Sequence, residues 1–148
     1  MEKIPSWIPV VALALHDNQG RCLMHLRGEE KHHGGLWEFP GGKVEPGEKP
    51  ANALVREIDE ELGITLDAAS IMPAHFAEET VEAGKTQIVI LLYTLAGWTG
   101  QEPVQPSALE GGAVGWFTPA EIELLDKPPL DILLARQLFG QDRQTDRN

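Results

Sequence analysis

The stretch 56-REIDEELGI-64 places three glutamates, Glu57, Glu60 and Glu61, at the end of a predicted helix. Acidic side chains near the C-terminus of a helix oppose its macrodipole, and carboxylates four residues apart repel each other. Charged helix faces are usually only solvated, but a helix selected for stability alone would carry lysine or arginine at this end. The concentration of negative charge therefore indicates a functional role for these side chains.

The helix that carries the glutamates is predicted to span residues 49–62. Pro50 suits its first turn, and Gly63 suits the left-handed residue just beyond its end. Apolar side chains recur at helical spacing and form one stripe: Ala51, Leu54, Val55, Ile58 and Leu62. At about 100° per residue, the three glutamates share an arc of about 100° beside that stripe. They are therefore expected to lie together on one side of the helix.

Around this helix, the sequence alternates between predicted strands and loops. Apolar and β-branched runs predict strands at 7–17, 21–27, 71–79 and 86–98, with a short strand at Trp116 and Phe117. Loops are predicted at 28–36 and 99–115, and a short strand with a structured loop at 37–48. The turn signal DNQG joins the first two strands into a hairpin, and 86–98 is continuous enough to be a central strand. The tail 119–139 is predicted to form helical turns interrupted by Pro128 and Pro129, and the polar end 140–148 to fray.

Length and composition limit the kind of protein. The 148 residues are expected to form one domain, 1–148, with a core at about 7–139. No apolar run approaches the ~20 residues needed to cross a bilayer, and the first residues lack a signal-peptide core. Cys22 is the only cysteine and is interpreted as a small core residue, so we expect no disulfide and a cytoplasmic location. A net charge of −11 argues against binding to nucleic acid, which needs a basic face, and without a long apolar run no membrane partner is expected either.

The glutamates follow directly on a glycine-rich loop, 41-GGKVEPGE-48. Carboxylates together with loop carbonyls supply hard oxygen ligands, which suit Mg²⁺ or Mn²⁺, and such a cation typically also binds substrate phosphates. A P-loop is excluded because Gly47 is followed by Glu48 instead of lysine. The sequence also has no G-x-G-x-x-G, H-E-x-x-H, EF-hand loop or serine nucleophile elbow. A cation site for a phosphorylated small molecule is therefore the favoured interpretation.

The spacing of these residues resembles a known family. Gly42, five residues, Glu48, seven residues and then 56-REIDEELGI-64 match the Nudix box, G-x5-E-x7-R-E-U-x-E-E-x-G-U, at every defined position, where U is a bulky aliphatic residue. The flanking 37-WEFPGGK-43 resembles the MutT-type branch, the nucleoside triphosphate pyrophosphohydrolases. The resemblance implies an α/β fold, the Nudix α/β/α sandwich, in which a mixed β-sheet is flanked by the box helix and a C-terminal helix.

The resemblance also implies roles for individual residues. The implied metal ligands are the carbonyl of Gly41 and the side chains of Glu57, Glu60, Glu61 and Glu110, the last lying six residues before Trp116. Arg56 and Glu48 resemble the pair that braces the helix and orients Glu57. Glu57 is the predicted general base, with Glu61 and Glu110 as rivals.

Four further residues are implied to contact substrate. Lys43 follows the glycine pair and is placed to meet phosphate oxygens, while Arg27, twelve residues before Phe39, resembles an arginine that contacts the nucleotide. Phe39 is implied to flank the base. Asp131 follows a Pro-Pro pair at the position where MutT-type proteins carry a base-binding asparagine. The alternative interpretation of Asp131 is that it caps the final helix.

The implied function is Mg²⁺-dependent hydrolysis of a nucleoside triphosphate, an oxidised or modified one such as 8-oxo-dGTP or a (d)CTP, to the monophosphate and pyrophosphate. One alternative is another nucleoside diphosphate derivative as substrate: ADP-ribose, a dinucleoside polyphosphate or a nucleotide sugar. Another is a nucleotide-sensing domain without turnover. The histidines are interpreted as surface or packed residues without ligand partners: His16, His25, His32, His33 and His75. The sequence leaves the oligomeric state and the number of cations open.

Overall fold

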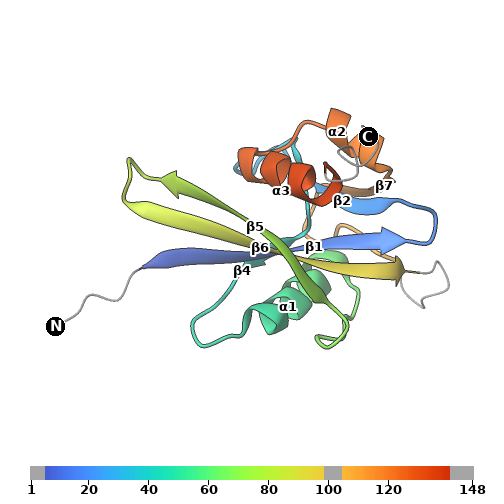
Figure 1. The fold of residues 1–148 in the computed structure, drawn as a ribbon, viewed down its shortest axis with the longest axis horizontal. Helices are drawn as coiled ribbons and strands as arrows, with labels where there is room; N and C mark the ends of the chain where they lie inside the picture. The colour runs from blue at the N-terminus through green and yellow to red at the C-terminus, as the bar shows by residue number, and fades with distance from the viewer. Residues whose placement is uncertain (1–5, 99–104, 141–148) are drawn as a thin grey trace, which may run out of the picture.

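The computed structural model describes residues 6–98 and 105–140. The described strands are β1 (Trp7–Asp17), β2 (Cys22–Leu26), β3 (Trp37–Glu38), β4 (Gly41–Lys43), β5 (Met72–Val81), β6 (Thr86–Trp98) and β7 (Ala113–Phe117). The described helices are α1 (Pro50–Leu62), α2 (Pro119–Leu124) and α3 (Pro129–Phe139). Figure 1 shows α1 on one side of the sheet and α2 with α3 on the other. The predicted α/β/α sandwich is therefore confirmed.

The strands form one mixed sheet in the order β3-β2-β1-β6-β5, with β4 paired to β1 and β7 paired to β2. The pair β1–β6 is parallel and the other pairs are antiparallel. Strand β6 is central, as predicted. Strand β1 pairs with β6 along one edge. Along its other edge, β1 pairs with β4 at Val10–Ala12 and with β2 at His16, so β4 and β2 contact different parts of β1. Residues of both β4 and β2 line one cavity.

The core has two layers because the side chains of β1 alternate between the faces of the sheet. Val11, Leu13 and Leu15 pack toward α1, whereas Ala12 and Ala14 pack in the layer that contains α2 and α3. The predicted apolar stripe of α1 is confirmed at its centre, where Leu54, Ile58 and Leu62 have no exposed surface, while Ala51 and Val55 are partly buried. Cys22 is buried in the second layer, as predicted.

The helix ends follow the sequence signals. Pro50 is the first residue of α1, and Gly63 ends it with a φ of 71°, its N–H donating to the Asp59 carbonyl. Helix α3 begins at Pro129 with Pro128 as its cap residue, and no side chain of the described residues caps it. Asp131 lies in the third position of that helix, so the interpretation of Asp131 as the helix cap is wrong.

The remaining predicted elements also appear. Strands β1 and β2 form the predicted hairpin, and β7 begins at Ala113, three residues before the predicted Trp116. The loop residues 99–104 and the tail 141–148 lie outside the described residues. In the described ranges, no helix is both long and apolar enough to cross a membrane.

Candidate active site

Arg56 forms hydrogen bonds with three glutamates of the box, Glu48, Glu57 and Glu60. Its Nε and Nη2 donate to the two carboxylate oxygens of Glu48, both at 2.9 Å. Its Nη1 donates to Glu57 at 2.9 Å and to Glu60 at 3.4 Å. Its Nη2 also donates to the Lys43 carbonyl at 3.1 Å. One guanidinium therefore ties the loop that follows β4 to α1 and offsets the repulsion between the carboxylates.

Two pKa shifts follow from this arrangement. Hydrogen bonds from the Arg56 guanidinium lower the pKa of Glu48 to about 2. Burial raises the pKa of Glu57 above its ordinary value, although the contact with Arg56 opposes this rise. Glu48 is therefore a permanent anion at neutral pH, whereas Glu57 has an increased affinity for a proton.

The glycine pair lets the loop approach two other parts of the chain. A β-carbon on Gly42 would lie 2.3 Å from the carboxylate carbon of Glu57. A β-carbon on Gly41 would overlap the carbonyl oxygen of Val11 on β1. Real β-carbons essentially never come this close to another heavy atom. At Gly41 the obstacle is backbone, so β4 can approach β1 only with glycine there, whereas a side chain at Gly42 would displace the carboxylate end of Glu57.

A cavity of about 330 Å³ adjoins this cluster. It is lined by residues of β1, β2, β3, β4, α1, β6 and α3 and of the loop before β7. The predicted site residues that line it are Arg27, Phe39, Gly41, Lys43, Glu57, Glu61, Glu110 and Asp131. Three predicted residues are not among its described lining: Arg56, Glu48 and Glu60. The structure thus brings most of the predicted metal ligands and all predicted substrate contacts to one cavity.

Glu60 differs from its neighbours in the box. Half of its side chain is exposed, and its carboxylate contacts Arg56 from outside the cavity. Glu61, in contrast, is 7% exposed, and its Oε2 accepts a hydrogen bond of 3.3 Å from the Gly41 N–H. The two adjacent glutamates therefore have different environments, because α1 turns them to different sides.

His25 is a site residue that the sequence interpretation missed. It is 5% exposed and lines the same cavity. Its Nδ1 lies 3.0 Å from Glu61 and 3.5 Å from Glu38, and its Nε2 lies 3.2 Å from the Gly111 carbonyl. Burial alone would lower the pKa of His25, but the two carboxylates raise it to about 10. His25 is packed, as the sequence interpretation allowed, but its two carboxylate neighbours and its position in the cavity were not predicted.

A signal for His25 was present in the sequence. Residues two apart on a strand share a face, so His25 belongs on the side of Arg27, which was predicted to contact the nucleotide. Glu38 was missed as well. It pairs with His25 across β2 and β3, and its carboxylate accepts from Arg27 Nη1 at 3.2 and 3.3 Å. This pairing depends on the sheet register, which the sequence alone does not give.

Asp131 reaches the cavity from α3. It is 5% exposed, and its Oδ1 accepts a hydrogen bond of 3.0 Å from the Phe39 N–H. Burial raises the pKa of Asp131 to about 7, more than this hydrogen bond lowers it. Phe39 is 3% exposed and packs in the second core layer. The contact joins α3, on one face of the sheet, to the short segment between β3 and β4.

The loop that carries Glu110 is attached to the end of α1. The N–H of Leu109 donates to the Glu61 carbonyl at 3.0 Å, and the N–H of Ser107 donates to the Leu62 carbonyl at 3.1 Å. On the other side, Lys31 Nζ donates to the carbonyl of Glu110 at 3.3 Å. These bonds place the exposed Glu110 at the rim of the cavity, on the side of the box glutamates.

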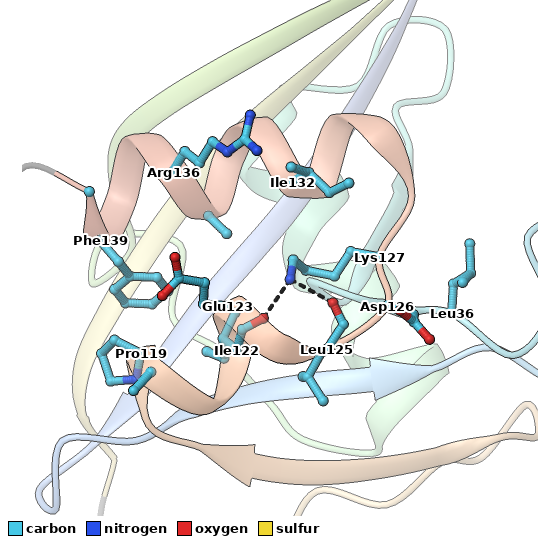
Figure 2. Close-up of a pocket in the computed structure, with 13 residues that line it drawn as sticks. Leu36, Pro119, Ile122, Glu123, Leu125, Asp126, Lys127, Ile132, Arg136 and Phe139 are labelled. Carbon is cyan, nitrogen blue, oxygen red and sulfur yellow. Dashed lines mark hydrogen bonds between the residues drawn. The ribbon is translucent and has the colours of Figure 1, made fainter.

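A larger cavity of about 710 Å³ lies between α2 and α3 (Figure 2). Lys127 enters it, and Figure 2 shows its Nζ donating to the carbonyls of Ile122 and Leu125. Burial lowers the pKa of Lys127. The hydrogen bonds satisfy carbonyls at the end of α2, which is a structural role. None of the described residues that line this cavity is a box carboxylate, so the acidic chemistry belongs to the smaller cavity.

The chain is similar to known proteins over most of its length. The NUDIX domain matches residues 7–138. A CTP pyrophosphohydrolase of Escherichia coli K12 is 45% identical over 71 residues, 48% of this chain and 52% of that protein, so the match spans about half of that relative. An 8-oxo-dGTP diphosphatase of the same strain is 33% identical over 118 residues, 78% of this chain and 83% of that protein. The solution structure of the E. coli ORF135 protein has a TM-score of 0.77 and 30% identity, covering 97% of this chain and 96% of that one.

Proposed function

Because the chain belongs to the NUDIX family, we propose that it is a MutT-like pyrophosphohydrolase that uses Mg²⁺ to cleave a nucleoside triphosphate into the monophosphate and pyrophosphate. Mn²⁺ would be an alternative cation. The observation that carries the proposal is one cavity with carboxylates at one side, Glu57 and Glu61, and the cations Arg27 and Lys43 near them. Such a cavity can hold a cation and a triphosphate together. We propose modified or cytosine nucleotides as substrates, which the names of the two E. coli relatives support.

The donor groups fit a hard divalent cation. The carboxylates of Glu57, Glu61 and Glu110 line the cavity together with Gly41, whose carbonyl is the proposed fourth oxygen donor. An all-oxygen set of this kind suits Mg²⁺, which prefers carboxylates, carbonyls and water. Glu60 stays a proposed ligand at the edge of the set, since its carboxylate is half exposed and lies outside the lining.

The protein groups have distinct proposed roles in hydrolysis. Mg²⁺, when bound, neutralises phosphate charge and acidifies a water molecule. Glu57 accepts the proton from the attacking water, since its carboxylate lines the cavity beside the proposed cation ligands. Arg56 contacts Glu57 from outside the described lining of the cavity and is itself held by Glu48, so this pair is proposed to orient Glu57. Glu61 and Glu110 are the alternative bases, because both line the same cavity.

The substrate-binding residues lie at other walls of the cavity. Lys43 is exposed and lines the cavity, which suits contact with phosphate oxygens. Arg27 is held by Glu38, and 32% of its side chain surface stays exposed for contact with the nucleotide. Phe39 and Asp131 lie against each other and are proposed to border the base. In this proposal the triphosphate and the base of the nucleotide are bound at different walls of the cavity.

A panel of substrates tests this proposal. Purified protein is incubated with Mg²⁺ and dCTP, 8-oxo-dGTP, dGTP, dTTP, ADP-ribose or a dinucleoside polyphosphate, and the products are separated by chromatography. Release of pyrophosphate and a nucleoside monophosphate from a triphosphate supports the proposal. Turnover of ADP-ribose or the dinucleoside polyphosphate alone would support the second substrate class. Binding of nucleotide without any product would instead indicate a sensing domain.

A further inference from the structure

Three side chains from different elements meet at one wall of the cavity. His25 comes from β2, Glu38 from β3 and Glu61 from α1. One ligand atom of each, a ring nitrogen and two carboxylate oxygens, lies within 4.8 Å of the others. The side chains of these residues are 7%, 17% and 9% exposed. Burial of two carboxylates side by side is costly unless a positive charge lies between them.

The ring of His25 is oriented by the backbone. Its Nε2 lies 3.2 Å from the carbonyl oxygen of Gly111, which only accepts, so Nε2 carries the hydrogen. Nδ1 then faces Glu61 and Glu38. Among the described residues, no hydrogen bond of acceptable geometry reaches Nδ1, although Glu61 Oε1 is only 3.0 Å away. A lone pair pointing at two carboxylates is repelled by both, so this position requires a cation or a proton.

The contact between His25 Nε2 and the Gly111 carbonyl is one that metal-binding histidines typically make. A ligating imidazole almost always donates its other ring N–H to a carbonyl or carboxylate, which fixes the ring and makes the ligand more basic. Gly111 provides this carbonyl. The adjacent Gly112 packs its backbone against the carbonyl of Leu26, where a β-carbon would overlap the oxygen. The loop therefore approaches β2 closely enough to hold the imidazole.

We propose that His25, Glu38 and Glu61 form a binding site for a divalent transition-metal cation of the class of Zn²⁺ and Co²⁺. One imidazole nitrogen with two carboxylate oxygens is a ligand set that these cations bind well, whereas Mg²⁺ favours oxygen ligands alone. The site adjoins the proposed Mg²⁺ ligands and shares Glu61 with them. The inference rests on the proposed function only for the assignment of Glu61 to that cation centre.

The test measures cation binding without nucleotide, so its result does not depend on turnover. Zn²⁺ is titrated into the full chain by calorimetry, once without Mg²⁺ and once in an excess of Mg²⁺, because Mg²⁺ occupies sites made only of oxygen ligands but also competes for the shared Glu61. The variants are His25→Gln, which keeps a donor for the Gly111 carbonyl, and Glu38→Gln, which keeps an acceptor for Arg27. The matched control is His75→Gln, since His75 lies on β5, outside the described lining of the cavity. Circular dichroism establishes that each variant is folded.

We expect wild type and His75→Gln to bind Zn²⁺ equally. His25→Gln and Glu38→Gln should bind it at least about tenfold more weakly. With Co²⁺ as the probe, the visible absorption spectrum should change in His25→Gln and stay unchanged in His75→Gln. Equal Zn²⁺ affinity in wild type and in both site variants overturns the proposal. Absence of Zn²⁺ binding to wild type overturns it too, and leaves a protonated imidazole between the carboxylates as the explanation of the geometry.

Discussion

The carboxylate of Glu57 lies directly over the backbone of Gly42, so close that a β-carbon on Gly42 would come within 2.3 Å of it. The two residues are fifteen apart in the sequence and belong to β4 and α1. The contact gives a steric reason for glycine at this position. It also predicts that even the smallest side chain there displaces the proposed general base.

Gly42→Ala is therefore expected to lower kcat by about 100-fold, the loss typical of a catalytic group moved by about 1 Å. The measurement is kcat for Gly42→Ala, Glu57→Gln and the double variant. Because the alanine acts through Glu57, it should add little to the loss in the double variant. Fully additive losses would mean that Gly42 matters for another reason.

Arg56→Lys is expected to be nearly as harmful as Arg56→Ala. The guanidinium reaches both oxygens of Glu48 and still donates to Glu57, and an ammonium has no planar fork with which to do so. We expect both variants to lose most of kcat while remaining folded, as judged by kinetics and circular dichroism. Full activity in Arg56→Lys would show that a positive charge alone is sufficient at this position.

Asp131→Asn is expected to change the preference for the base. The Asn carbonyl can keep the hydrogen bond from the Phe39 N–H, but its other atom becomes a donor where the carboxylate offers an acceptor. In assays above pH 7, where Asp131 is ionised, it should favour guanine and cytosine, which present donors, over thymine and uracil. Ratios of kcat/KM for dGTP, 8-oxo-dGTP, dCTP and dTTP should shift by about tenfold or more, since an unpaired buried polar group costs about 1–3 kcal/mol. Unchanged ratios would remove Asp131 from base recognition.

The same carboxyl predicts a pH dependence of stability. Burial raises the pKa of Asp131 in the folded protein to about 7, against 3.8 as its ordinary value. Between these pH values the folded state holds the proton and the unfolded state does not, so the free energy of unfolding falls as pH rises, by up to about 1.4 kcal/mol per pH unit. Asp131→Asn lacks this group. The Tm of wild type should therefore fall relative to that of the variant as pH rises through this window. If the Tm of wild type and that of Asp131→Asn change in parallel with pH, the pKa of Asp131 is not raised by folding.

The box helix and its ends could be predicted from the sequence because their signals are local. Pro50 and Gly63 define the ends of α1, and the apolar spacing places Leu54 and Ile58 in the core. Likewise, the apolar and β-branched run at 7–17 is enough to predict a strand. Each of these properties depends on neighbours within a few residues.

The wall formed by His25 and Glu38 could not be predicted in this way. Its assembly depends on the register between β2 and β3 and on the turn of α1 that aims Glu61 at the same point. The different environments of Glu60 and Glu61 have the same origin, since the helical arc alone groups them together. Long-range pairing, which local patterns do not encode, decides these contacts.

Glu57 is the proposed base for the water that attacks a nucleoside triphosphate. The role is tested by kcat for pyrophosphate release by wild type and by Glu57→Gln, with saturating substrate and Mg²⁺ and with circular dichroism to establish the fold. The amide keeps the shape of the side chain but loses both its charge and its basicity. We predict a folded variant whose kcat falls by far more than tenfold, a loss above about 1.4 kcal/mol. A variant that keeps more than about a tenth of the wild-type kcat would contradict this role.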